Sequence, residues 1–155
     1  MPQIEKGGKF IFGISVVQDN FSVCFPPQAI KEYNIISEGK IYLFTGSKKT
    51  GGFCVTRKGL LEPSKLAHIL LENPDLRHYK LHPGSFIKYK GRSYCWLPIT
   101  EKGIIQLTSD MLHFLDLHPR TELLSIRSSD IAFTMGAKGP LLEKARNYEG
   151  VIEHY

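Results

Sequence analysis

The sequence lacks most of the features that identify an exported, membrane-spanning or disulfide-stabilised protein. Its 155 residues include only three cysteines, Cys24, Cys54 and Cys95, which are far apart and form no CxxC pair. An odd number of dispersed cysteines is typical of small core residues in a reducing compartment. No apolar run approaches the roughly 18 residues of a membrane helix, and the run at 10–17 is followed by no small-residue cleavage site. The sequence therefore predicts a soluble, cytoplasmic protein with no membrane partner.

Local catalytic and metal-binding motifs are also missing. The sequence has no GxSxG, no HExxH, no dinucleotide fingerprint, and no Cys and His at a recognisable catalytic spacing. His78 and His82 are four residues apart, but Pro83-Gly84 follows and no third ligand comes at a familiar interval. We therefore expect a protein that is not an enzyme, with no metal and no cofactor.

The clearest positive feature is an internal repeat. Residues 19–61 align with residues 101–141 at an offset of 82, which slips to 80 from Phe53 onward, as a turn shortened by two residues would produce. A unit that cannot bury its own apolar face usually buries it against a copy of itself. The aligned apolar pairs include Val23 with Ile105, Ala29 with Met111, Ile30 with Leu112, Tyr33 with Leu115 and Ile41 with Leu123.

Each copy has the same predicted order of strand, strand, short helix, strand, strand. In the first copy we expect a hairpin from 9–17 and 21–25, a two-turn helix after Pro26-Pro27, and a second hairpin from 40–45 and 53–56. Longer helices are expected at 63–73 and from Pro140 to about Tyr148. We interpret 1–155 as one domain, with a first repeat at 9–62, a helix and basic insert at 63–90, and a second repeat with its C-terminal helix at 91–150.

The two copies resemble a known family. FSVCFPPQAIKEYNIISEGKIYLF and GIIQLTSDMLHFLDLHPRTELLSI each have a strand ending in Pro or Thr, a short helix and a turn into a hairpin. This layout is similar to the AbrB/MazE/SpoVT swapped-hairpin superfamily, and two copies in one chain resemble the fused arrangement of MraZ-like proteins. The resemblance implies a mainly β fold, a pseudo-twofold swapped-hairpin AbrB-like β-barrel with a helix after each repeat. It also implies a prokaryotic source and DNA-binding transcription regulation.

The sequence departs from the family at the residues that commonly contact DNA. Members that bind DNA usually place Gly-Arg at the end of the first hairpin turn and one or two Arg on the short helix. The corresponding residues here are Phe21-Ser22 and Gly103-Ile104 at the turns, and Ile30-Lys31 and Leu112-His113 on the helices. Only Lys31 keeps a fixed charge, so the scaffold has more support than the family's mode of DNA binding.

Positive charge is concentrated in the first half and the insert. The chain has 20 Lys and Arg against 15 Asp and Glu, a net charge of +5. Residues 77–94, RHYKLHPGSFIKYKGRSY, contain no acid and interleave cations with aromatic side chains. Cations neutralise phosphates and aromatic rings stack on bases, so this composition suits nucleic acid, although a solvated strand pair would have it too. The candidate nucleic-acid-binding residues are Lys31, Lys48, Lys49, Arg77, Lys80, Lys88, Lys90 and Arg92.

Two glycine-containing turns could also hold an anion, and a glycine-rich tip resembles a phosphate-binding loop only at first sight. The tip Gly46-Ser47-Lys48-Lys49-Thr50-Gly51-Gly52 is not a P-loop, because a strand follows it and no Gly-Lys-Ser/Thr occurs at the required spacing. The turns Gly136-Ala137-Lys138-Gly139-Pro140 and Arg57-Lys58-Gly59 each lead from a strand into a helix. In each segment, glycine can equally serve a ligand-free turn through its conformational freedom.

Two functions therefore fit the sequence. The first is a nucleic-acid-binding, transcription-regulatory protein of AbrB-like type, with DNA a better partner than RNA and further self-association compatible with the family. The alternative is a non-catalytic protein-interaction or small-anion-sensing module that retains the barrel without DNA binding. Candidate cations gathered on one continuous face would favour the first function, and scattered cations the second.

Overall fold

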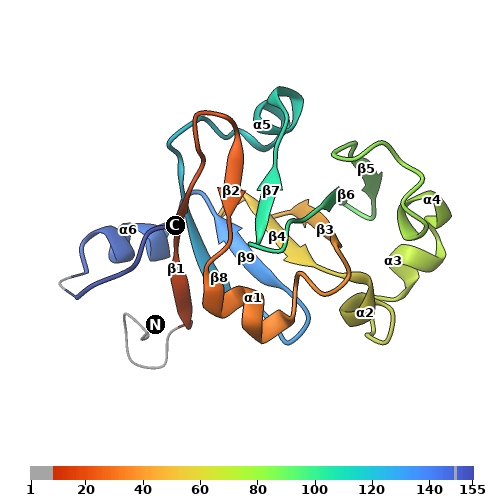
Figure 1. The fold of residues 1–155 in the computed structure, drawn as a ribbon, viewed down its shortest axis with the longest axis horizontal. Coiled ribbons are helices and arrows are strands. Elements are labelled where there is room, and N and C mark those ends of the chain that lie inside the picture. The colour runs from red at the N-terminus through yellow and green to blue at the C-terminus, as the bar shows by residue number, and fades with distance from the viewer. Residues whose placement is uncertain (1–8, 149) are drawn as a thin grey trace.

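The computed structural model describes residues 9–148 and 150–155. It contains nine strands and six short helices in this part of the chain (Figure 1). The first half holds Ile11–Val16 (β1), Ser22–Cys24 (β2), Pro27–Tyr33 (α1), Lys40–Thr45 (β3), Phe53–Thr56 (β4) and Lys58–Leu61 (α2). The insert holds His68–Leu71 (α3), Pro74–Arg77 (α4) and Ile87–Tyr89 (β5). The second half holds Arg92–Pro98 (β6), Ile104–Gln106 (β7), Ser109–Leu115 (α5), Glu122–Arg127 (β8), Phe133–Gly136 (β9) and Pro140–Arg146 (α6).

The fold is mainly β, as predicted, but the predicted barrel is not found. Seven of the described strands form one antiparallel sheet in the order β1-β8-β9-β4-β3-β6-β5, and β2 and β7 form a separate pair. The large sheet is open, with β1 and β5 at its edges. The expected hairpin of the first two strands is also wrong, because β1 pairs with β8 and β2 pairs with β7. The two strands diverge into different sheets after the turn at 18–21.

The element bounds follow the offsets of the repeat. Adding 82 to the residue numbers of α1 and β3 gives the bounds of α5 and β8, and adding 80 to those of β4 gives the bounds of β9.

The sheet order shows how the two halves combine. The first strand of each half pairs with the third strand of the other, β1 with β8 and β6 with β3. The second strands pair with each other, as do the fourth strands β4 and β9. Strand pairing therefore joins the two halves at every position of the repeat.

The main core lies between the large sheet and a layer made of α1, α5 and the β2–β7 pair. Alternate residues of the strands face it, as the period of two requires. Phe53, Val55, Phe133 and Met135 of β4 and β9 are fully buried here. The helices contribute Ala29 and Tyr33 from α1 and their repeat equivalents Met111 and Leu115 from α5.

Local sequence accounts for the limits of the two repeat helices. Pro27 occupies the first turn of α1, where its missing N–H has no partner to lose. The hydroxyl of Thr108 accepts a hydrogen bond from the Met111 N–H and caps α5. Asn34 and Asp116, which differ by the offset of 82, both adopt the left-handed conformation and end their helices.

The predicted helix at 63–73 is wrong, because the segment forms separate single turns instead. Pro63 follows α2, and the Ser64 hydroxyl donates to the Leu61 carbonyl at 2.7 Å. The side-chain amide of Asn73 donates to the Ile69 carbonyl at 2.7 Å. Pro74 then begins α4 rather than ending a helix. Consequently only the second half has the expected following helix, α6, which ends at Arg146.

Cysteine burial and helix length complete the account of the fold. Cys54 and Cys95 are buried, whereas Cys24 is only partly buried, and all three are free thiols. Burial raises the pKa of Cys95 to about 12, so this thiol stays protonated as a core residue. In the described part of the chain, no helix has the length and apolar character that crossing a bilayer requires.

Candidate nucleic-acid interface

The outer face of the large sheet, opposite the main core, is covered only at its two ends. Helix α6 packs on Ile14, Leu124 and Ile126 of β1 and β8. At the other end the segment from α2 to α4 packs on Tyr42 and Trp96 of β3 and β6. Figure 1 shows α6 on one side of the molecule and α2, α3 and α4 on the other. The central strands β9 and β4 lie between these two covers.

Three adjoining hollows run from the α6 cover across the central strands to the cover formed by α2–α4, and we call them together the outer-face groove. The α6 hollow, of about 450 Å³, lies beside α6, and the central hollow, of about 350 Å³, shares Lys9, Thr50 and Ile126 with it. The insert hollow, of about 390 Å³, shares Phe44, Arg92 and Ile131 with the central one. The small outward side chains of β4 and β9 leave this space open: Cys54, Thr56, Thr134 and Gly136.

Cations line the groove along its whole length. Among the described residues that form its walls there is no Asp or Glu. A cleft lined by one sign of charge over an apolar floor concentrates the field and attracts anions. The six cations are Lys9, Lys49, Lys138 and Lys144 at the α6 hollow, Arg92 at the central and insert hollows, and Lys90 at the insert hollow.

Aromatic side chains occupy the insert end of the groove. The Phe44 and Tyr94 rings lie 5.7 Å apart between centroids, and the Arg92 guanidinium lies 5.5 Å from the Phe44 centroid. Arg92 also donates a hydrogen bond from Nη1 to the Thr45 carbonyl at 3.4 Å. The Lys90 ammonium lies 5.4 Å from the centroid of the Tyr89 ring. Cations held against ring faces in this way can bind phosphates beside stacked bases.

A hydrogen-bonded cluster fixes the insert end. The Tyr89 hydroxyl donates to the Glu72 carboxylate and lies 2.9 Å from Nδ1 of His68, which joins β5 to α3. Burial and the hydrogen bond to Glu72 raise the pKa of Tyr89 to about 12. The phenol therefore remains a donor at neutral pH, and its role in this cluster is to position the wall of the insert hollow.

The 46–52 tip and the 136–140 turn, the latter a predicted anion-binding turn, come together at the other end. The N–H groups of Ala137 and Lys138 both donate to the Thr50 carbonyl at 2.9 Å. A methyl group at Gly139 would lie 2.8 Å from the Lys49 carbonyl oxygen, so only glycine allows this approach. The 46–52 tip and the 136–140 turn thus form one wall of the α6 hollow, because β4 and β9 are neighbours in the sheet.

The other predicted anion-binding turn is already occupied by the protein's own carboxylate. Glu38 accepts hydrogen bonds from Nη1 of Arg57 at 2.8 Å and from the Gly59 N–H at 3.0 Å. These contacts neutralise the Arg57-Lys58-Gly59 turn. An external anion has no comparable position there.

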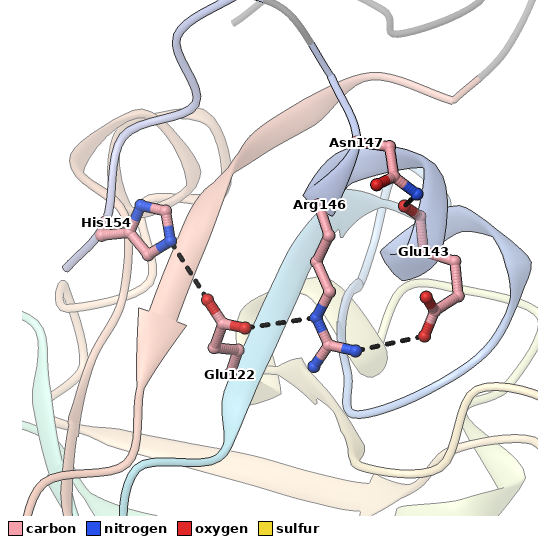
Figure 2. Close-up of polar contacts among 5 residues, drawn as sticks. All are labelled: Glu122, Glu143, Arg146, Asn147 and His154. Atoms are coloured by element: carbon pink, nitrogen blue, oxygen red, sulfur yellow. Dashed lines mark hydrogen bonds and ion pairs between the residues drawn. The ribbon is translucent and has the colours of Figure 1, made fainter.

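A polar network holds α6 against the sheet (Figure 2). Arg146 donates from Nε to Glu122 of β8 at 3.2 Å and from Nη1 to Glu143 at 3.1 Å. Nε2 of His154 lies 3.2 Å from the other oxygen of Glu122. The C-terminal segment also covers the edge of β1, where the Ile14 N–H donates to the Glu153 carbonyl at 2.9 Å. These contacts position the α6 side of the groove.

The eight candidate residues divide between the groove and other surfaces. Lys49, Lys90 and Arg92 line it, and Lys48 belongs to the same tip as Lys49. Arg77 forms an ion pair with Glu62 at 3.0 Å. Lys80 and Lys88 are exposed outside the groove walls, and Lys31 lies on α1, in the layer on the opposite side of the sheet. The candidates therefore do not form one continuous face, and by the criterion given above their scatter favours the protein-interaction or anion-sensing alternative.

Sequence reasoning missed Lys9 and Lys144 and did not choose Lys138 as a candidate. Lys9 precedes β1, Lys144 lies on α6 and Lys138 lies in the 136–140 turn, and only the sheet order brings these segments together at the α6 hollow. Lys138 had one usable signal, its place in a predicted anion-binding turn. Among the described residues no three His, Cys, Asp or Glu side chains gather as a metal site. Comparison with known proteins adds no family, since neither a protein-family model nor a curated protein matches the chain.

Proposed function

We propose that this protein binds nucleic acid, and that the outer-face groove holds a single strand. The observation that carries the proposal is the groove itself, three adjoining hollows lined by six cations and by no acid of the described chain. Phosphates of a strand would meet lysines at one end, and bases would meet the partly exposed rings of Phe44 and Tyr89 at the other. The hollows are lined by the sheet and two flanking covers, a shape that suits one strand better than a duplex.

The strand pairing supports kinship with the AbrB-like layout. The pairing of β1 with β8 and of β6 with β3 exchanges the first strands between halves, as an intrachain swapped-hairpin arrangement would. We therefore propose an intrachain swapped-hairpin arrangement that is built into an open sheet and not into a closed barrel. Transcription regulation enters only through this resemblance, and a cytoplasmic location through the free cysteines.

Fluorescence anisotropy with labelled single-stranded and duplex DNA across a salt series tests the proposal. Each phosphate contact steepens log affinity against log salt by about 0.7 on single strands. Replacing Lys49, Lys90 and Arg92 together by Ala should flatten that slope by about two units. The matched control replaces Lys31, Lys80 and Lys88, which removes the same charge from outside the groove and should leave most of the slope. Equal effects of the two triple variants, or no binding by the unaltered protein at low salt, would reject the groove.

One observation favours a protein-interaction module as a second candidate. Phe114 of α5 is 52% exposed and stacks on Phe86 with centroids 4.5 Å apart. Large exposed aromatic pairs occur at protein contacts more often than on plain surface. This candidate would be supported if the unaltered protein binds no nucleic-acid strand but binds a partner protein, and if Phe114→Ala abolishes that protein binding.

A further inference from the structure

The α6 hollow concentrates more positive charge than the rest of the groove. Four lysines line this hollow from four segments: Lys9 before β1, Lys49 in the 46–52 tip, Lys138 in the 136–140 turn and Lys144 on α6. Lys9, Lys49 and Lys138 form no ion pair with any described residue. Gathering four like charges raises their mutual repulsion, and a bound anion relieves it.

The walls of this hollow are built rather than incidental. The stem of Lys138 lies along Gly51, where an added methyl group would meet its Cγ and Cε at 3.5 Å. The Lys138 N–H is held by the Thr50 carbonyl, and Arg146 ties α6 to β8. Apolar side chains complete the lining, including Leu124, Ile126 and Leu142. Charge above an apolar floor acts more strongly on a ligand than charge on an open surface.

The repeat provides an internal comparison. In the first half, the strand-to-helix turn meets the carboxylate of Glu38 through Arg57 and Gly59. At offsets of 82 and 80, the residues equivalent to Glu38 and Arg57 are Arg120 and Ala137. Arg120 pairs with Asp19 at 3.5 Å and does not line the hollow, so the second half has no carboxylate at the position equivalent to Glu38. Its turn, now lined by lysines, borders a hollow of ligand size.

We propose that the α6 hollow binds a phosphate group with two or more negative charges. A diester within a strand carries one charge, whereas a phosphomonoester carries about 1.5 to 2 at neutral pH. Lys9, Lys49 and Lys138, which form no ion pair with described residues, match the higher charge. Such a group is found at a phosphorylated strand end or in a free polyphosphate. The strand-end source rests on the proposed function, whereas binding of a free polyphosphate does not.

Two probes separate these sources. The first is a single-stranded DNA with a 5′-phosphate, a 3′-phosphate or neither, and the second is inorganic triphosphate, whose binding is measured by calorimetry. We expect one phosphorylated end to bind roughly five- to tenfold more tightly than the unmodified strand, the effect of two or three added ion pairs. Inorganic triphosphate should bind directly and compete with that strand.

The decisive variant is Lys49→Ala with Lys138→Ala, and Lys80→Ala with Lys88→Ala is its matched control. The first pair should abolish both the end preference and triphosphate binding, and the control should keep them. Lys49→Gln with Lys138→Gln repeats the test with longer side chains if the alanine pair fails to fold. Strands that bind equally with and without a terminal phosphate, together with triphosphate binding unaffected by the first pair, would overturn this inference and leave the proposed function standing. Triphosphate binding by a protein that binds no strand would support this inference and reject the proposed function.

Discussion

Leu112 and Ile30 occupy equivalent positions in the two repeats, but the structure predicts unequal costs for truncating them. Leu112 is 5% exposed in the main core, whereas Ile30 is partly buried and packs at its margin. Leu112→Ala removes three carbons, worth roughly 2.4 kcal/mol of transfer free energy at about 0.8 kcal/mol each. The cavity left behind raises the expected loss to about 3 to 4 kcal/mol. Ile30→Ala should cost about 1 to 2 kcal/mol, because part of its side chain already contacts water.

Urea unfolding followed by circular dichroism measures both losses. The midpoint should fall while the slope against urea stays constant, as expected for a change in stability alone. His113→Ala is the control, since His113 is exposed on the same helix as Leu112 and should change stability by no more than about 0.5 kcal/mol. Equal losses at Leu112 and Ile30, or a loss below about 1 kcal/mol at Leu112, would refute this account of the core.

Two further changes test the backbone and the electrostatics. Gly103→Ala should destabilise the protein by about 1 to 2 kcal/mol, because Gly103 has a φ of 79° and its new methyl group would contact Cδ1 of Ile30; a thermal melt of this variant unchanged from the parent would contradict it. Glu32→Gln should flatten the acid limb of stability. The hydrogen bond and charge of Arg127 lower the pKa of Glu32 from its ordinary 4.5. The Glu32–Arg127 pair therefore contributes its full stabilisation above pH 4.5 and loses it as the pH falls through the lower pKa of the folded state. If urea titrations at a series of pH values show the same loss of stability in acid for Glu32→Gln and the parent, this reasoning is wrong.

Local signals predicted the repeat elements well. Prolines and the alternation of apolar residues lie within a few residues of the features they specify. The offset of 82 agrees with the observed bounds of α1, α5, β3 and β8, and the offset of 80 with those of β4 and β9. Pairing partners were harder, because an alternating strand pattern says which face is buried but not which strand lies beside it. The hairpin expected from β1 and β2 failed for this reason, since both strands pair across the repeat instead.

The insert shows a different limit. Leu61, Ile69, Leu70 and Leu76 are all buried against the outer face, and Tyr42 donates to the Leu76 carbonyl at 3.2 Å. A single helix was predicted from local propensity between Pro63 and Pro74. Short turns were observed instead, held by Ser64, Asn73 and the sheet itself. Tertiary contacts determine such a segment more than propensity does.

The candidate site was hard to predict for both reasons: the sequence shows neither which strands are neighbours nor how tertiary contacts shape the insert. Residue type alone selected the cations of the densest positive run, residues 77–94. That run contributes only two cations to the groove, Lys90 and Arg92. The remaining cations are separated by up to 135 residues, between Lys9 and Lys144, and meet because β1, β8, β9 and β4 are consecutive in the sheet. The repeat contained the relevant clue: pairing the fourth strand of each half places the tip before β4 beside the turn after β9. Comparison of equivalent residues, Glu38 with Arg120 and Arg57 with Ala137, then distinguishes a turn neutralised by the protein's own carboxylate from one that lacks such a carboxylate.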